Sequence, residues 1–221
     1  MKELVIATKN PDKERELKRL LRGSGVKVIS LDRYPGSPNV KEGSRSFREN
    51  AVRKAMAVSR FTGKPALADD SGLETDALNG RPGVRSSRFA GKGATYVQNN
   101  RKLLKMLTGK RVKHRGAQFR CVVAVCDYPR LVGITEGRIR GRIAFAPKGR
   151  YGFGYDPVFI VPRYGKTFAQ LGPKIKHRIS HRARALNKAK KLIVKTAIKA
   201  PSRLPQDKSS GKSSIPLCTC L

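Results

Sequence analysis

Short apolar segments alternate with longer amphipathic segments along most of this chain. Residues 2–7, 26–31, 65–68, 117–126 and 157–161 have the length and apolar content of strands, and 131–144 reads as further extended segments. Residues 12–22, 47–61, 95–107 and 180–198 carry apolar side chains at helical spacing, with Ala185, Ala189, Leu192 and Ala197 facing inward in the last of them. This alternation predicts an α/β fold built around a sheet.

The composition allows a folded core and gives no sign of a membrane protein. Of the 221 residues, 38% are hydrophobic, which is enough to bury a core. No apolar run reaches the length of a membrane span, and residues 1–7 are too short an apolar stretch for a signal peptide. We therefore expect a cytoplasmic protein with no membrane partner.

The four cysteines indicate neither a disulfide framework nor a metal site. Cys121 and Cys126 lie in one predicted strand at an odd spacing, which places them on opposite faces. Cys218 and Cys220 lie in a polar tail. We therefore expect the four thiols to be reduced, as is usual for cysteines of cytoplasmic proteins.

The net charge of +34 is the most unusual property of the sequence. It comes from 49 Lys and Arg against 15 Asp and Glu. A field of this size attracts polyanions but does not determine a fold. Two interpretations stay open: a solvated basic surface, or a surface that binds RNA or DNA. The basic residues are spread along the chain, which does not separate the two.

The first segment with chemical potential is the turn from Thr8 to Lys13. Asn10 is a good helix N-cap and Pro11 suits the first helical position, so free backbone N–H groups are expected at an anion-binding helix start. Lys13 would oppose the helix dipole unless an anion lay in front of it. The alternative is a solvent-facing lysine on an ordinary first turn.

The second segment is Asp69-Asp70-Ser71-Gly72, at the predicted end of a buried strand. Adjacent carboxylates repel each other unless a cation is present, and Mg²⁺ takes one or two carboxylates together with substrate phosphates. Gly72 would permit a sharp turn. Glu42 and Glu49 are candidate helpers. The alternative is a plain Asp-Ser-Gly turn that ends a strand.

Two further segments supply an aromatic ring and cationic donors. In the segment 152–157, glycines flank Phe153, whose ring can stack on a nucleobase. Lys176, His181 and Arg182 supply donors for phosphate and for a base edge. Alternatively, the ring fills a turn at a strand start, and the cations form a generic basic cap.

Taken together and in order, these segments resemble the inosine triphosphate pyrophosphatase family, the Ham1-like enzymes. The matching stretches are 6–10 with Lys13, 46–51 with Lys54, 66–73, 80–84, 152–157, 165–167 and 179–182. The resemblance extends from residue 2 to about residue 198. It implies an elongated mixed sheet flanked by helices, two lobes with a central active-site cleft, and a homodimer.

The resemblance also implies an activity, a cofactor and a role for each matched residue. The activity is hydrolysis of ITP, dITP and XTP to the monophosphate and pyrophosphate, which cleanses the nucleotide pool. Asp70 would activate the attacking water, and Glu42 and Asp70 would hold Mg²⁺. The substrate would be bound by Thr8, Lys9, Asn10, Lys13, Ser71, Phe153, Gly154, Tyr155, Asp156, Lys176, His181 and Arg182.

The expected boundaries are a pyrophosphatase domain over residues 1–199 and a disordered basic tail over 200–221, where little can be buried. Two other functions remain possible: a nucleic-acid-binding protein on the same fold, and a pyrophosphatase acting on modified pyrimidine nucleotides. The stretch 173–178 is basic where members of the family usually carry acids, which leaves nucleotide selectivity and product release open.

Overall fold

A seven-stranded mixed sheet runs the length of the molecule in the order β2-β1-β3-β4-β5-β6-β7. The computed structural model describes residues 2–40, 43 and 46–198, with no side-chain description for residues 2 and 194–198. The strands are β1 (Lys2–Ile6), β2 (Val26–Ser30), β3 (Ala66–Thr75), β4 (Gly116–Asp127), β5 (Arg130–Ile143), β6 (Phe159–Val161) and β7 (Lys166–Thr167). Strand β1 is parallel to β2 and β3, and the remaining pairs are antiparallel. The predicted α/β fold with a mixed sheet is confirmed.

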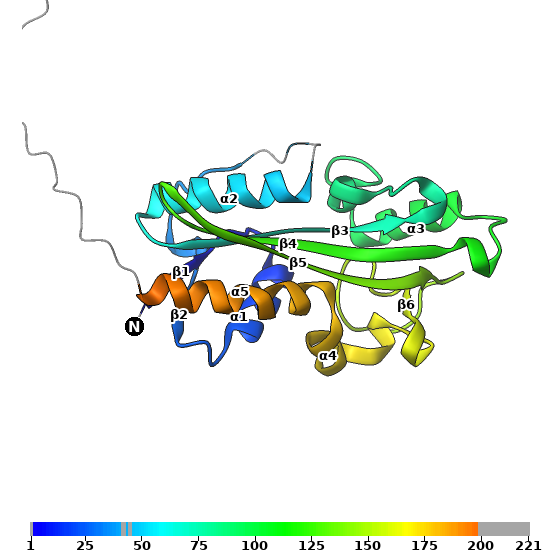
Figure 1. Cartoon of the computed structure of the whole chain (residues 1–221). Coiled ribbons are helices and arrows are strands. Elements are labelled where there is room, and N and C mark those ends of the chain that lie inside the picture. Colours follow the sequence, from blue (N-terminus) through cyan, green and yellow to red (C-terminus); the bar gives the residue numbers. More distant parts are fainter. Residues whose placement is uncertain (1, 41–42, 44–45, 199–221) are drawn as a thin grey trace, which may run out of the picture.

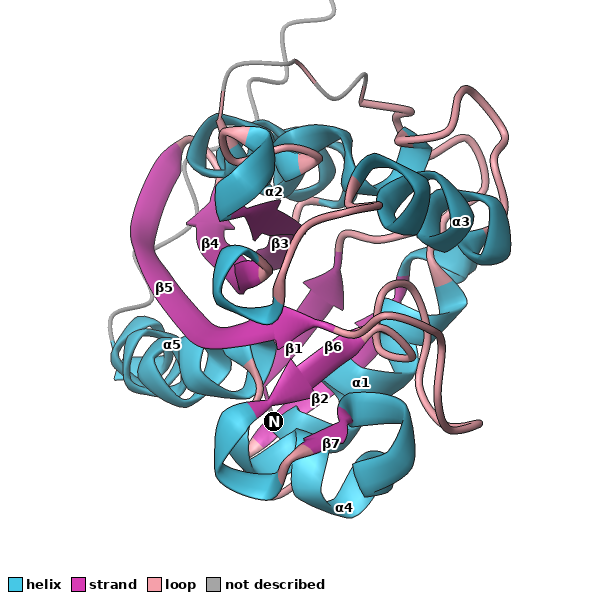
Figure 2. Ribbon diagram, turned by 90° about the vertical axis from the view of Figure 1, so that its right-hand side faces the viewer, coloured by secondary structure: helices cyan, strands magenta, loops and turns pink. Residues whose placement is uncertain are grey.

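Five α-helices in the described part of the chain pack around this sheet. They are α1 (Pro11–Leu21), α2 (Phe47–Thr62), α3 (Tyr96–Met106), α4 (Phe168–Ile179) and α5 (His181–Ile198). Helix α2 lies on one side of the long strands β3, β4 and β5, while α1 and α5 lie on the other (Figure 1). Viewed from the end, β5 curves toward β6 and the sheet curls around the second lobe (Figure 2).

The core is divided in the way that a two-lobed molecule requires. In the first lobe, one cluster packs α2 against the face of β3 and β4 that carries Ala68 and Val122. A second cluster packs α1 and α5 against the opposite face, which carries Leu67 and Val123. A third cluster fills the second lobe around Phe159. The long strands join the lobes, so residues in the middle of β3 lie where the lobes meet.

The register between β1 and β3 positions the first motif beside the second. Ile6 pairs with Leu67 in parallel, so the turn that follows β1 emerges next to residues 69–71 of β3. Helix α1 begins in this turn, with Asn10 as its N-cap and Pro11 in its first turn, as predicted. The helices predicted from apolar spacing all form, with ends within one residue of the predicted ones.

Three of the longer elements differ from the sequence prediction. Strand β3 does not end at Ala68 but continues to Thr75, because β4 supplies a complete antiparallel partner to residues 66–75. Residues 131–144 form most of one long strand, β5. Helix α4 was not predicted, since Gly172 (φ 74°) and Pro173 interrupt its helical pattern.

The inward face of α5 agrees in part with the prediction. Ala185 and Ala189 are buried, Leu192 is half-buried, and Leu186 and Ile193 also face the core. The side chain of Ala197 and the predicted tail of residues 200–221 lie outside the described residues, as does residue 199.

Both cysteines of β4 are buried free thiols on opposite faces, as predicted. Burial raises the pKa of the Cys126 thiol to about 11, and burial likewise raises the pKa of Cys121. Within the described part of the chain, no helix has the length and apolar character needed to cross a membrane.

Candidate active site

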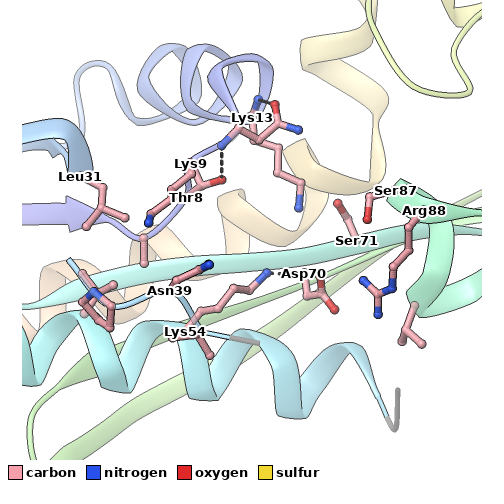
Figure 3. Close-up of a pocket in the computed structure, with 16 residues that line it drawn as sticks. Thr8, Lys9, Lys13, Leu31, Asn39, Lys54, Asp70, Ser71, Ser87 and Arg88 are labelled. Atoms are coloured by element: carbon pink, nitrogen blue, oxygen red, sulfur yellow. Dashed lines mark hydrogen bonds and ion pairs between the residues drawn. The ribbon is translucent and has the colours of Figure 1, made fainter. Parts of the chain in front are cut away.

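Two adjoining cavities lie between the lobes, on either side of the middle of β3. The larger, of about 440 Å³, is lined by the turn after β1, the start of α1, Lys54 of α2, Asp70 and Ser71 of β3, and Val84, Ser87 and Arg88 from the second lobe (Figure 3). The smaller, of about 80 Å³, is lined by residues 153–156 together with Lys176, His181 and Arg182. Both cavities are lined by Asn10, Lys13, Ser71 and Ser87.

Every predicted site residue that the structure describes lines one of these cavities. Thr8, Lys9 and Asp70 line the larger, the residues from 153 onward line the smaller, and Asn10, Lys13 and Ser71 line both. Glu42 lies outside the described residues. Glu49, the other candidate helper, lies in the first turn of α2 and lines neither cavity.

The turn before α1 differs from the expected anion site. The Oδ1 atom of Asn10 accepts hydrogen bonds from the backbone N–H groups of Asp12 (2.9 Å) and Lys13 (3.2 Å). The backbone N–H of Asn10 donates to Oγ1 of Thr8 at 3.2 Å. The prediction of free N–H groups at this helix start is therefore wrong, because the cap residue itself satisfies them. An anion in the larger cavity would therefore be bound mainly by side chains.

Asp69 and Asp70 do not share one site. Successive residues of a strand point to opposite faces, and both aspartates lie inside β3 rather than at its end. Asp69 faces α1 and α5, where its Oδ2 lies 3.3 Å from Nζ of Lys13 and 3.2 Å from the Arg182 guanidinium. Asp70 faces α2. The prediction that these two neighbouring carboxylates repel each other and share one cation is therefore wrong.

Asp69 is a fully buried carboxylate that remains ionised. Burial opposes its ionisation, but the charges of Lys13, Arg182 and Lys54 outweigh burial and hold the pKa of Asp69 far below its ordinary range. Lys13, expected to face an anion alone, is therefore already paired. Two opposite charges in a desolvated site hold each other in place.

Asp70 is held by two residues on one face of α2. Nδ2 of Asn50 donates to Oδ2 of Asp70 at 2.9 Å, and Nζ of Lys54 lies 3.3 Å from Oδ1. Nζ of Lys54 also donates to the backbone carbonyl of Asp69 at 2.8 Å. Asn50 and Lys54 are four residues apart, so they project from the same side of the helix. They fix the carboxylate at the wall of the larger cavity.

Arg88 completes the set of cations around the larger cavity. It lies at the end of a short 3₁₀ helix, Gly83–Arg88, on the second-lobe side of the cavity beside Asp70 (Figure 3). Together with Lys9, Lys13 and Lys54 it surrounds a space that also contains the Asp70 carboxylate. Sequence reasoning did not place Lys54 or Arg88 in the site. The helical spacing from Asn50 was a usable signal for Lys54, but nothing distinguished Arg88 from neighbouring arginines.

A buried chain of charges connects the two cavities. Nζ of Lys176 lies 2.6 Å from Asp156 and 2.5 Å from Glu16, and Glu16 also contacts the Arg182 guanidinium. Arg182 continues the chain to Asp69. Burial opposes ionisation of Glu16, but Arg182 and Lys176 outweigh it and lower its pKa. Burial also opposes the charge on Arg182, whose pKa is nevertheless raised by Asp69 and Glu16.

Phe153 forms a wall of the smaller cavity. The loop is closed by Asp156, whose Oδ2 accepts the backbone N–H of Phe153 at 2.9 Å. Nζ of Lys176 lies 4.4 Å from the centre of the Phe153 ring. The Tyr155 ring is buried instead, and its hydroxyl donates to the carbonyl of Ser86 at 2.9 Å, so only its backbone can contact a ligand in the way expected.

Tyr96 is a site residue that sequence reasoning missed. It begins α3 in the second lobe, and its ring centre lies 5.9 Å from that of Phe153. Its hydroxyl donates to Oδ2 of Asp12 at 3.1 Å and accepts from Nδ2 of Asn10 at 3.3 Å. Tyr96 therefore joins the aromatic wall to the turn before α1. These partners are 84 and 86 residues away, so no local pattern could reveal the contact.

His181 is a neutral imidazole in the smaller cavity. Burial lowers its pKa well below the ordinary value, and the charges of Arg182 and Lys176 lower it further. Its ring stacks on Phe119 with centres 4.6 Å apart. Nδ1 of His181 is buried and has no hydrogen-bond partner among the described residues. An unpaired buried polar atom is costly, and a ligand group could satisfy it.

Gly72 is required by close packing and not by a sharp turn. It lies inside β3, and a Cβ at this position would overlap the carbonyl of Gly83 and the hydroxyl of Ser86. The prediction that it turns the chain is wrong. The glycine lets residues 83–88 approach β3 closely, which brings Ser87 and Arg88 to the cavities.

The described residues contain no group of three or more His, Cys, Asp or Glu side chains that could enclose a metal ion. Mg²⁺ does not need such a group, because it is commonly held by one or two carboxylates with water and substrate phosphates. The oxygen chemistry of Asp70, at the wall of a cavity lined by cations, fits that mode of binding.

Comparison with known proteins agrees with this arrangement. The model of the Ham1 family matches residues 4–192. The chain belongs to the Ham1 family. The chain is 48% identical over 191 residues to a dITP/XTP pyrophosphatase of Desulforamulus reducens, covering 86% of this chain and 95% of that protein. A dITP/XTP pyrophosphatase of Geobacillus kaustophilus is 50% identical over 188 residues, covering 85% and 92%.

Solved structures of Ham1 proteins share the fold of this Ham1-family chain. The HAM1 protein of Coxiella burnetii superposes with a TM-score of 0.80 at 41% identity, over 88% of this chain and all of that one. The Ham1 protein of Staphylococcus aureus gives a TM-score of 0.78 at 37% identity, with the same coverage.

Proposed function

We propose that this Ham1-family chain hydrolyses ITP, dITP and XTP to the monophosphate and pyrophosphate. One observation carries the proposal: the Asp70 carboxylate lies at the wall of a cavity lined by cations, which adjoins a second cavity with an aromatic wall. A triphosphate and a base need these two environments side by side. The similar proteins named dITP/XTP pyrophosphatase support the same activity.

The triphosphate occupies the larger cavity. Lys9, Lys54 and Arg88 line it from three different elements and can bind phosphate oxygens with their side chains. Thr8 and Asn10 shape the turn beside them. Because the cations come from both lobes, the phosphate chain lies across the cleft.

The base occupies the smaller cavity beside Phe153. Inosine and xanthine carry an oxygen at C6, where adenine carries an amino group. The Lys176 ammonium lies over the Phe153 ring, and the buried Nδ1 of the neutral His181 has no hydrogen-bond partner in the described part of the chain. Donors that the C6 oxygen satisfies would stay unpaired beside an amino group, which gives strong discrimination against ATP.

The Asp70 carboxylate accepts the proton of the attacking water. The water attacks the α-phosphorus, the bond from that phosphorus to the bridging oxygen breaks, and pyrophosphate leaves. Asn50 and Lys54 orient the carboxylate toward the cavity. Lys13, held in place by Asp69, and Arg88 compensate the negative charge that accumulates on the phosphates.

Asp70 would hold Mg²⁺ together with the substrate phosphates, and Glu42 is the second expected ligand. When bound, Mg²⁺ supplies additional positive charge at the phosphate oxygens. The proposal extends to a homodimer in the cytoplasm. The free, buried thiols of Cys121 and Cys126 agree with a reducing compartment. Light scattering during size-exclusion chromatography tests the dimer.

A nucleotide panel tests the function. We expect Mg²⁺-dependent release of pyrophosphate from ITP, dITP and XTP, with kcat/KM at least about a hundred-fold higher than for ATP. A modified pyrimidine triphosphate that was hydrolysed faster than these purines would contradict the proposed substrate class. Release of orthophosphate instead of pyrophosphate would contradict cleavage at the α-phosphorus.

A further inference from the structure

Two stretches of the chain that contribute to one end of the second lobe contain no acidic residue. There is no Asp or Glu between residues 77 and 126, or between residues 137 and 155. The cations in the first of these stretches include Arg101, Lys102, Lys105, Lys110, Arg111 and Lys113, and all six are exposed. The proposed hydrolysis uses none of them.

Arg115 holds these two stretches together. Its buried guanidinium donates to the backbone carbonyls of Leu107 (2.8 Å), Ile143 (2.9 Å) and Ala144 (2.7 Å). The end of α3 is thereby fixed against the end of β5. The segment 110–114 and the segment 145–150 therefore form parts of one surface, made of chain that carries no carboxylate.

An exposed aromatic ring lies on this surface. The Phe145 side chain is 66% exposed, and the guanidinium carbon of Arg115 lies 4.5 Å from its ring centre. Every residue from 145 to 150 is exposed, including Lys148. A large apolar side chain that is exposed to solvent among cations does not contribute to the hydrophobic core. We call Lys110, Arg111, Lys113, Phe145 and Lys148 the basic end.

We propose that the basic end binds single-stranded nucleic acid. Lys110, Arg111 and Lys113 would bind phosphates of the backbone, and Phe145 would stack on a base. The combination of a cationic track with an exposed ring is what sequence-tolerant single-strand binding requires. A duplex keeps its base faces stacked inside, so the ring would gain nothing from it.

Charge favours this ligand over a second copy of the chain. In a symmetric dimer through this surface, each cation cluster would face its own counterpart. Asp76 lies beside Gly116, but it already pairs with Arg140 at 3.1 Å. A polyanion, in contrast, neutralises the cations as it binds.

The experiment measures fluorescence anisotropy of a labelled 20-nucleotide RNA of mixed sequence, alone and as a duplex, with the full-length protein between 50 and 200 mM NaCl. One variant combines Lys110→Ser, Arg111→Ser and Lys113→Ser. The matched control combines Arg22→Ser, Arg33→Ser and Arg60→Ser, which removes the same charge from exposed positions of the other lobe. Unchanged hydrolysis of ITP shows that each variant is folded.

We expect the first variant to reduce the slope of log K against log salt by about 2, since each single-strand phosphate contact contributes roughly 0.7. The control should leave the slope nearly unchanged. Phe145→Ala should weaken single-strand binding about five-fold or more without changing the slope.

Four results would overturn the proposal. Equal slope losses in both triple variants would mean that the whole charged surface binds. Undiminished binding by Phe145→Ala, or equal affinity for the duplex, would remove the stacking contact. Conversion of a dimer to a monomer by Phe145→Ala, with RNA binding retained, would assign the surface to a second copy of the chain.

Discussion

Asp69 and Asp70 are neighbours in the sequence, yet they lie on opposite faces of β3 and pair with different cations. Asp69 forms ion pairs with Lys13 and Arg182. Asp70 forms an ion pair with Lys54 at the wall of the larger cavity, in which the triphosphate is proposed to bind. The strand thus separates a carboxylate that organises the cleft from one that can reach a substrate. Substitution of the two residues should therefore have different consequences.

Replacement of Asp70 by Asn should abolish turnover and leave the fold intact. The amide keeps the shape of the side chain but cannot accept a proton from water. We expect kcat for ITP to fall by a factor of about 10² or more, with a melting temperature close to that of the wild type. Pyrophosphate release and thermal unfolding measure the two effects. Near-normal turnover in this variant would remove Asp70 from its proposed role.

Replacement of Asp69 by Asn should instead destabilise the protein. The change leaves Lys13 and Arg182 without their shared carboxylate in a site that excludes water. Breaking a buried pair in this way costs about 3–5 kcal/mol of unfolding free energy. Urea unfolding at pH 7 measures it, and Asp127→Asn, a change at the far end of β4, is the comparison. A loss no larger than that of the comparison would show that the buried pair is unimportant.

Asp69 also predicts an acid limit to stability. Its folded pKa lies far below its unfolded value of about 3.9. The contribution of the ionised form is therefore complete above about pH 4 and declines as the pH falls below that value, because the unfolded chain then takes up a proton that the folded chain does not. Asp69→Asn should lack this part of the decline. Unfolding free energies at pH 3 and pH 6 for both proteins provide the comparison.

Tyr96→Phe should raise the KM for ITP and change kcat little. The hydroxyl of Tyr96 holds Asn10 and Asp12, while its ring lies against Phe153. Removal of the hydroxyl loosens the turn before α1, and we expect KM to rise about three- to ten-fold, in line with one or two lost hydrogen bonds. Inhibition by inorganic triphosphate, which has no base, should weaken as well.

The control for Tyr96 is Tyr164→Phe, an exposed tyrosine after β6 that lines neither cavity. It should leave both constants unchanged. If Tyr96→Phe weakens ITP but not inorganic triphosphate, the residue acts at the base and not through Asn10. If it leaves both unchanged, Tyr96 has no positioning role.

Four of the five helices named above follow from local apolar spacing, and the resemblance of short motifs to a known family brought together most of the residues that line the two cavities. Apolar spacing defines a helix, and the short motifs around Asn10, Asp70 and Phe153 carry their own chemistry. The length of β3 could not be predicted in the same way. Asp-Asp-Ser-Gly looks like a turn, and it becomes the middle of a strand only because β4 lies beside it and buried cations neutralise Asp69.

The contacts that complete the cleft depend on distant parts of the chain. Tyr96 reaches Asn10 across the gap between the lobes, and Arg182 reaches Asp69 from 113 residues away. Asn10 satisfies the N–H groups that seemed available to phosphate. In each case the residue types were visible in the sequence, but their partners are set by the way the strands and helices pack.

The burial of His181 in the smaller cavity can be tested both by stability and by nucleotide selectivity. Burial lowers its folded pKa well below the unfolded value of about 6.5. Below that pH, the unfolded chain binds a proton that the folded chain refuses, so stability should fall from pH 6.5 toward pH 5. His181→Asn should flatten this fall, which unfolding free energies at pH 5 and pH 6.5 for the variant and the wild type measure. The imidazole of His181 stays neutral in the folded protein. The pH profile of kcat/KM for ITP should therefore contain no titration near pH 6.5 that the His181→Asn substitution removes. Nδ1 of His181 has no partner among the residues that the structure describes, so we expect it to bind the base. The ratio of kcat/KM for ITP to that for ATP should therefore be smaller in His181→Asn than in the wild type. Unchanged discrimination would place recognition of the C6 oxygen on Lys176 or Arg182.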